Sequence, residues 1–187
     1  VMFTSDNGPL AGDRLDPEIN DSNGPLRGVL REVYEGGNRV PMIARWPDSI
    51  APASVSDHSC SNVVVLQTCA EVAGATAPPG DGISFLPTLL GRHAEQKRHD
   101  HLYWEFYERG SAQAVRRGAW KAVRKPMISG EIELYNLDRD PGETDNVAAS
   151  HPDIVREIAA IMKSQHQPSS FWRAPAAKSK PSDTIRR

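Results

Sequence analysis

The sequence predicts an α/β protein, in which part of an α/β domain precedes a small antiparallel sheet packed on a carboxyl-terminal helix. Three observations support this prediction. Residues 1–91 combine short apolar runs with many Gly and Pro residues, as at the loop-rich rim of an α/β sheet. From residue 102 onward, short apolar segments alternate with turn residues, which is typical of antiparallel strands. After His151, apolar residues recur at helical spacing.

The first region contains candidate strands and one helix. Residues 1–4 read as a buried strand that ends at a run of turn-forming residues, and residues 40–46 as a second strand bounded by Pro47. Ser61 is a candidate cap for a helix that ends at Gly74. The expected apolar face of this helix is Val63, Leu66, Ala70 and Ala73. Periodicity alone also allows residues 63–66 to be a strand, but the length of the segment and Gly74 favour the helix.

The second region reads as four strands and a helix. The strands are expected at residues 102–107, 114–117, 119–124 and 132–137, with a tight turn at Arg117-Gly118. Pro152 suits the first position of the helix. Its apolar stripe should pack on the sheet, and we expect Trp104 to contact it. The stripe consists of Ile154, Ile158, Ile161 and Met162.

We therefore expect three segments: a domain part at residues 1–91, a sheet-and-helix subdomain at 101–166 and a disordered tail at 167–187. Residues 91–100 are polar and read as a linker, and the tail is rich in Pro, Ser, Lys and Ala. Because the chain begins directly with a strand, we also expect further sequence upstream of Val1. An export signal, if there is one, would lie there, so the compartment is unknown.

Composition excludes several classes of function. The net charge of -2 offers no basic face for nucleic acid. No apolar run approaches the roughly 20 residues needed to cross a bilayer, so no membrane partner is expected. Cys60 and Cys69 lack metal-ligand spacing and read as small apolar residues.

The first chemical signal lies just after the opening strand, where Asp6 and Asn7 are followed by Gly8. Ligands gather beyond the carboxyl ends of strands in open α/β sheets. A carboxylate and a carboxamide offer hard oxygen ligands that suit calcium or magnesium. The alternative is an Asx turn that merely ends the strand.

A second signal favours the metal site. Residues 23–41 contain Leu26-Arg27-Gly28-Val29-Leu30 and Tyr34-Glu35-Gly36-Gly37-Asn38-Arg39-Val40-Pro41. Together with Ser5-Asp6-Asn7-Gly8, these motifs resemble the sulfatase family of the alkaline-phosphatase-like superfamily. The resemblance continues through residues 81–90, 103–105, 117–121 and 133–137, and covers nearly everything from Val1 to Gln165. It implies the carboxyl-terminal part of an alkaline-phosphatase-like α/β sandwich.

The resemblance implies hydrolysis of aryl or carbohydrate sulfates by a formylglycine nucleophile, with a divalent cation, usually Ca²⁺, as Lewis acid. It assigns metal binding to Asp6 and Asn7. Neither Cys60 nor Cys69 starts the nucleophile motif Cys/Ser-x-Pro-x-Arg. We therefore expect no catalytic nucleophile in this chain and no turnover by the chain alone. The missing amino-terminal part of the same protein is its expected partner.

Within the matched region, Leu30 occupies the position of the family's sulfate-binding lysine. Leucine can neither donate a hydrogen bond nor carry charge. The adjacent Arg31 and the histidines His99 and His101 are candidates for the edge of the substrate site. The acidic group Asp138, Asp140, Glu143 and Asp145 does not have the spacing of an EF-hand loop and reads as a turn with solvated charges.

Two alternatives stay open. The chain could be a non-catalytic module that binds anionic glycans or a partner protein. It could also belong to a hydrolase of the same superfamily that acts on phosphodiesters or phosphonates, and the loss of charge at Leu30 is compatible with this.

Overall fold

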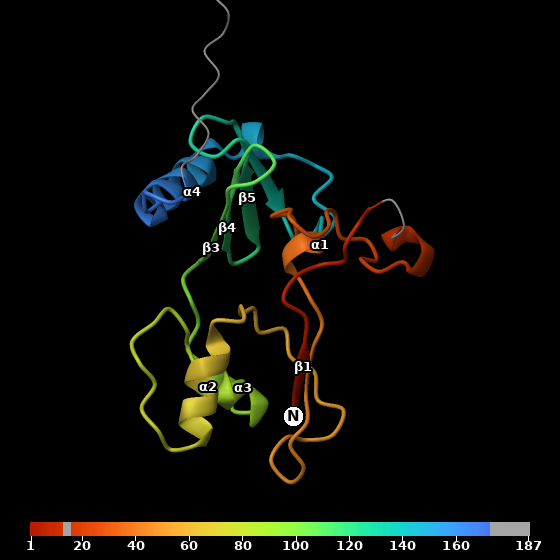
Figure 1. Cartoon of the computed structure of the whole chain (residues 1–187), viewed down its shortest axis with the longest axis vertical. Coiled ribbons are helices and arrows are strands. Elements are labelled where there is room, and N and C mark those ends of the chain that lie inside the picture. The colour runs from red at the N-terminus through yellow and green to blue at the C-terminus, as the bar shows by residue number, and fades with distance from the viewer. Residues whose placement is uncertain (13–15, 173–187) are drawn as a thin grey trace, which may run out of the picture.

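The computed structural model of the chain describes residues 1–12 and 16–172. Figure 1 shows a sheet with a long helix at one end of the molecule, and a strand pair with two shorter helices at the other. In these residues no helix is both long and apolar enough to pass through a membrane. The elements in chain order are β1 (Met2–Thr4), η1 (Pro17–Asn20), α1 (Glu35–Asn38), β2 (Met42–Ala44), α2 (Val64–Val72), α3 (Leu86–Leu89), η2 (His93–Glu95), β3 (Leu102–Phe106), β4 (Ala112–Arg117), β5 (Trp120–Arg124), β6 (Ile132–Asn136), η3 (Ala148–Ser150) and α4 (Pro152–Gln165).

The second region forms the predicted antiparallel sheet, and the strands lie in the order β3-β4-β5-β6. Its register places Val115 opposite Ala122, and Ala122 opposite Leu134. Because side chains alternate between the faces of a strand, these three residues share one face. On that face they pack against Ile158 and Met162 of α4. The predicted helix and its contact with the sheet are confirmed.

The opposite face of the sheet receives residues from the first region. Val33 and Tyr34 pack there against Ala114, Val123 and Tyr135. Figure 1 accordingly shows α4 on one side of the sheet and α1 on the other. The sheet is therefore covered on both faces, on one of them by a segment about 100 residues earlier in the chain.

The prediction for Trp104 is wrong. Trp104 packs on the face that holds Val33 and Tyr34, whereas its neighbour Tyr103 packs on the α4 face. Successive residues of a strand point to opposite faces, so only one of the two aromatic side chains can meet the helix. Sequence alone does not say which.

The prediction that the first strand is buried is also wrong. β1 pairs only with β2, in an antiparallel ribbon. Phe3 lies opposite Ile43, and each is 62% exposed. A two-stranded ribbon has few neighbours to cover its faces. Its apolar side chains consequently stay open to solvent.

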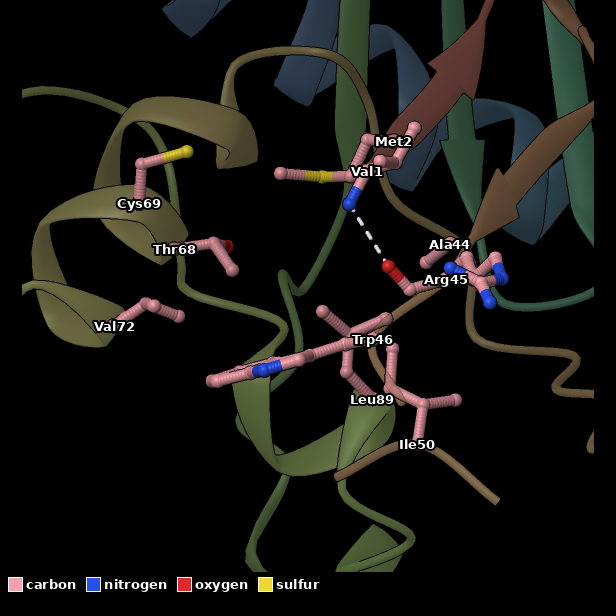
Figure 2. Close-up of a pocket in the computed structure, with 10 residues that line it drawn as sticks. All are labelled: Val1, Met2, Ala44, Arg45, Trp46, Ile50, Thr68, Cys69, Val72 and Leu89. Atoms are coloured by element: carbon pink, nitrogen blue, oxygen red, sulfur yellow. Dashed lines mark hydrogen bonds between the residues drawn. The ribbon is translucent and has the colours of Figure 1, made fainter. Parts of the chain in front are cut away.

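One side of the ribbon and helices α2 and α3 line an apolar pocket of about 310 Å³. Figure 2 shows Met2 and Trp46 from the ribbon and its continuation, with Val72 of α2 and Leu89 of α3 around it. The amino group of Val1 donates a hydrogen bond to Arg45 O at 2.8 Å. Neither a carboxylate nor an imidazole lines this pocket, and most of its lining residues are apolar.

The structure confirms that this segment is a helix, α2, rather than a strand. The predicted cap residue and the predicted apolar face are both wrong. Ser61 lies outside it and makes no side-chain cap, because Val63 is the N-cap residue. Val63 and Leu66 are 49% and 55% exposed. The buried residues are Val64 and Thr68. Thr68 Oγ1 donates to Val64 O and accepts from Phe85 N, so the helix turns this side toward the segment that leads into α3.

The predicted division into segments 1–91, 101–166 and 167–187 stays a prediction. The polar stretch 91–100 contains the short helix η2, and residues 33–34 pack on the second region. Most of the predicted disordered tail, residues 173–187, lies outside the described residues.

Candidate metal-binding and substrate site

Asp6 and Asn7 lie where β1 ends, as the sequence predicts. Asp6 is exposed and Asn7 is half-buried. Ser5 Oγ donates to the carbonyl of Asn7 at 2.9 Å, and Asn62 Nδ2 donates to the carbonyl of Ser5 at 3.2 Å. These bonds hold the backbone of the segment. They leave both candidate ligand side chains outside the hydrogen bonds and ion pairs of residues 1–12 and 16–172.

The Asx-turn alternative has no support in the geometry. An Asx turn at Asp6 would need its carboxylate to accept from a backbone N–H two residues on, at Gly8. Gly8 N instead donates to Gly37 O at 2.9 Å. The carboxylate of Asp6 is therefore not used to make the turn.

The side-chain oxygens of Asp6 and Asn7 are of the type that binds a hard divalent cation. A carboxylate and a carboxamide oxygen side by side are ligands that calcium accepts. Calcium takes about 6–8 oxygen ligands, so two side chains supply only a part of a site. Within the described residues no group of three or more His, Cys, Asp or Glu side chains could hold a metal ion.

Leu30 is brought to this segment. Its backbone N–H donates to Pro9 O at 2.9 Å, and its side chain is half-buried. The segment after Asp6 and Asn7 and the segment of Leu30, which this bond joins across 21 positions, therefore lie side by side. Residue 30 is a leucine, so its side chain brings no charge to this place.

Arg31 turns toward another part of the molecule. Its backbone is in the left-handed region, with φ of 73°. Its guanidinium Nε lies 3.6 Å from Glu108 Oε2, in the loop between β3 and β4, and both side chains are about half exposed. Arg31 thus pairs with the edge of the sheet subdomain.

His99 and His101 line a second pocket, of about 370 Å³, where the α2 amino terminus meets β3. His99 Nε2 is buried and has no hydrogen-bond partner in the described part of the chain. His101 Nδ1 lies 3.4 Å from Asp100 Oδ2. The lining also includes Asp81, Tyr103 and Gln165, but not Asp6, Asn7 or Leu30. The candidate metal ligands and the two candidate histidines therefore fall into two places rather than one.

Asn62 links these two places, and sequence reasoning missed it. Its side chain bonds Ser5 O, while its neighbours Ser61 and Val63 line the histidine pocket. No sequence pattern points to Asn62, because the contact joins residues 57 positions apart.

Arg27, in the matched motif, fixes the loop on the sheet. Its Nη1 donates to Tyr135 Oη and to Glu143 O, both at 3.0 Å, and its guanidinium lies 3.9 Å from the centre of the Tyr34 ring. Tyr135 Oη also donates to Glu133. Burial and the nearby Glu133 carboxylate raise the pKa of Tyr135 to about 12, so the phenol stays protonated at neutral pH.

The prediction that the acidic group after β6 is solvated is wrong for Glu143. Its side chain is fully buried and lies near the equally buried Lys121 and Glu35. Asp140 does behave as a turn residue, since its carboxylate accepts from the backbone N–H groups of Thr144 and Asp145. Charge spacing alone does not distinguish these two carboxylates.

Comparison with known proteins identifies the family. A family model described as N-sulphoglucosamine sulphohydrolase, C-terminal, matches residues 30–168. The chain is 30% identical to an N-acetylgalactosamine-6-O-sulfatase of Bacteroides thetaiotaomicron over 88% of this chain and 35% of that protein. It is 32% identical to human arylsulfatase A over 86% of this chain and 36% of that protein. The chain thus spans about a third of the length of these relatives.

Comparison with solved structures leads to the same family. One from work on the metabolism of multiple glycosaminoglycans by Bacteroides thetaiotaomicron matches with a TM-score of 0.70 and 28% identity, over 88% of this chain and 38% of that one. Ps i-CgsB in complex with k-i-k-neocarrahexaose matches with a TM-score of 0.69 and 26% identity, over 94% of this chain and 38% of that one. The fold is that of the carboxyl-terminal part of an alkaline-phosphatase-like sulfatase. The chain belongs to the sulfatase family and corresponds to the carboxyl-terminal part of its members.

Proposed function

We propose that the protein to which this chain belongs hydrolyses sulfate esters of carbohydrates, and that this chain contributes part of its calcium site. The observation that carries the proposal is the segment after β1, where Asp6 and Asn7 present unused oxygen ligands beside the backbone of Leu30. Calcium, when bound, supplies a Lewis acid for the sulfate oxygens. The role of this chain is to hold that cation through Asp6 and Asn7.

The chain alone should not turn over sulfate esters, since no Cys/Ser-x-Pro-x-Arg motif occurs in it. We propose that an amino-terminal part of the same protein supplies the nucleophile and the remaining metal ligands. The same part would cover the exposed apolar residues of β1 and β2, such as Phe3 and Ile43. The relatives, of which this chain spans about a third, are long enough to contain such a part.

The histidine pocket suits an uncharged portion of a substrate better than a sulfate group. Asp81 and Asp100 are among its lining residues, and neither Lys nor Arg is. Carboxylate, imidazole and amide side chains can bond sugar hydroxyl groups, whereas the carboxylates would repel an anion. We therefore propose that His99 and His101 contact a sugar unit beside the sulfated position.

Sequencing the DNA upstream of the codon for Val1 tests the enzyme assignment. An in-frame extension that encodes Cys/Ser-x-Pro-x-Arg and a pair of aspartates after an early strand supports it. A stop codon directly upstream contradicts it and favours a non-catalytic binding module.

Calcium titration of the full-length protein, followed by calorimetry, tests the metal assignment, because this chain supplies only some of the ligands. Asp6→Ala should abolish the binding heat. The matched control Asp16→Ala removes an exposed carboxylate that caps η1 and should leave it unchanged. Equal heats for all three proteins would contradict the role of Asp6.

Turnover by the full-length protein tests the substrate class. Leu30→Lys should raise the rate on sulfate esters, because one transition-state contact of this kind contributes a factor of roughly 10²–10³. His101→Ala should raise KM for N-acetylgalactosamine 6-sulfate and leave KM for 4-nitrophenyl sulfate, which has no sugar, unchanged. An equal change for both substrates would exclude a sugar contact at His101.

A further inference from the structure

Four charged residues form a cluster between α1 and the sheet: Glu35, Arg116, Lys121 and Glu143 (the Lys121 cluster). Lys121 Nζ lies 2.8 Å from Glu35 Oε1 and 3.6 Å from Glu143 Oε1, and all three side chains are at most 3% exposed. Arg116 Nη1 lies 3.5 Å from Glu35 Oε2. Ions that are buried lose their hydration, so a cluster like this one is weak support for stability. The cluster matters instead because it fixes the relative positions of the segments that it joins.

Glu143 holds the first residue of α1 directly. Its Oε2 accepts a hydrogen bond of 2.6 Å from the backbone N–H of Glu35. Its own backbone has φ of 54°, a left-handed conformation that residues with side chains rarely adopt, and its carbonyl accepts from Arg27. Glu143 is therefore fixed from several sides while it binds α1.

On its other side, α1 supports the turn that follows Asp6 and Asn7. Gly37 O accepts the hydrogen bond from Gly8 N at 2.9 Å. The approach is so close that a Cβ added at Gly8 would lie 1.9 Å from Gly36 O. Because Gly8 comes directly after Asn7, the position of α1 sets where the ligand segment turns away from β1.

These contacts form one continuous connection: Lys121 and Glu143 hold Glu35, Glu35 begins α1, and α1 supports Gly8. We propose that Lys121 and Glu143 are positioning residues for the Asp6–Asn7 segment, through which the carboxyl-terminal sheet sets the geometry of the metal site. The link to Gly8 is independent of any ligand. Its consequence for metal binding rests on the proposed function.

Hydrogen exchange at the Gly8 amide in the 187-residue chain tests the positioning. Lys121→Met keeps the volume of the side chain and removes the charge that binds Glu35. The protection of Gly8 should fall by at least about tenfold, since a hydrogen bond to a charged group contributes that much. The matched control is Lys125→Met, whose lysine is 40% exposed and 3.8 Å from Glu32, and it should leave Gly8 unchanged.

The amide of Leu134 in β6 provides the internal reference, because a purely structural role would loosen the sheet as well. Loss of protection at Leu134 equal to that at Gly8, or no change at Gly8, would overturn the proposal. Should Lys121→Met fail to fold, Glu143→Gln and Glu143→Ala take its place. Glutamine keeps an acceptor for the Glu35 N–H, so Glu143→Gln should retain more protection at Gly8 than Glu143→Ala. Equal exchange in these two variants would also overturn it.

Calcium calorimetry on the full-length protein and the same variants separates this proposal from the assignment of the metal site. If the unmutated full-length protein binds calcium, Lys121→Met should weaken binding about 10–100-fold, as changes behind metal ligands do, while Lys125→Met should not. Unchanged affinity in Lys121→Met would refute the link to the metal. Absence of binding in the unmutated full-length protein would refute the metal site itself, and the exchange at Gly8 would still decide the positioning role.

Discussion

The two halves of the molecule bury their apolar residues to very different degrees. In the sheet subdomain, Val115, Ala122 and Leu134 are completely buried between the strands and α4. In the ribbon of the first region, Phe3 and Ile43 face each other across the strands and both are 62% exposed. The sheet builds its core largely from neighbouring hairpins and the helix that follows. Segments near the ribbon in sequence do not cover its apolar side chains, so their burial depends on more distant partners.

The contrast predicts where the chain is sensitive to mutation. Leu134→Ala should destabilise it by about 2–5 kcal/mol, because truncation leaves a cavity in a core that cannot collapse. Leu66→Ala, at a residue 55% exposed on α2, should change stability by less than about 0.5 kcal/mol. Urea unfolding of the two variants measures this difference. Equal losses would mean that α2 is covered in solution in a way the structure does not show.

The contact between the turn after β1 and α1 should be the next most sensitive place. Gly8→Ala forces a Cβ against the backbone oxygen of Gly36 and should cost about 1–3 kcal/mol, as overpacking does. The control is Gly80→Ala, where the nearest atom is the end of the Gln67 side chain at 3.3 Å. Thermal unfolding compares them, and a neutral Gly8→Ala would show that the turn can move away from α1.

The sheet subdomain should lose stability in acid through Glu105. Burial acts to raise the pKa of this carboxyl, but hydrogen bonds from Tyr103, Tyr107 and His166 outweigh it and lower the pKa below 4.5. A lowered folded-state pKa stabilises the protein above the unfolded value, and this contribution disappears as the pH falls through the folded-state pKa. Glu105→Gln should therefore weaken the acid dependence of stability.

Glu143 should change the pH dependence of stability in the opposite direction. Burial raises the pKa of its carboxyl in spite of Lys121, so the folded state binds this proton more tightly than the unfolded state does. Its contribution is complete below the unfolded pKa of about 4.5 and is lost as the pH rises through the raised value. Urea unfolding between pH 3 and 8 should give opposite changes in slope for Glu105→Gln and Glu143→Gln, and parallel curves would contradict both assignments.

The smallest effect is expected for the ion pair of Arg31 with Glu108 at the edge between the regions. Both side chains are about half exposed, so solvent screens the pair and its coupling should be about 0.2–1 kcal/mol. A double-mutant cycle with Arg31→Gln and Glu108→Gln measures it. A larger coupling would show that the two regions hold each other more tightly here than a surface pair allows.

The sequence predicts the sheet subdomain better than the first region. The strand positions, the turn at Gly118 and the stripe on α4 all follow from periodicity over neighbouring residues, which the structure preserves. In α2 the same reasoning selects the wrong face. The helix meets the rest of the chain through Thr68, whose hydroxyl binds Phe85 N, and a polar buried residue gives no hydrophobic signal.

For the candidate site, the structure brings the backbone of Leu30 next to the segment that follows Asp6 and Asn7, and it leaves His99 and His101 in a separate pocket. The metal and substrate roles of these residues stay predictions. Asn62 and the Lys121 cluster were not predictable. Each depends on contacts between residues far apart in the chain, such as the bond between Glu35 and Glu143 across 108 positions.

By itself, then, the sequence determined the family, the positions of the strands in the sheet region and the residue types at the strand end, because motifs and periodicity are local properties. Tertiary structure alone decided which side of the sheet receives Trp104, that Glu143 is buried while Asp140 is not, and that α1 supports Gly8. Burial and charge pairing depend on which distant segments meet. A charged residue in a turn gives the same local sequence pattern whether it is exposed to water or buried beside Lys121.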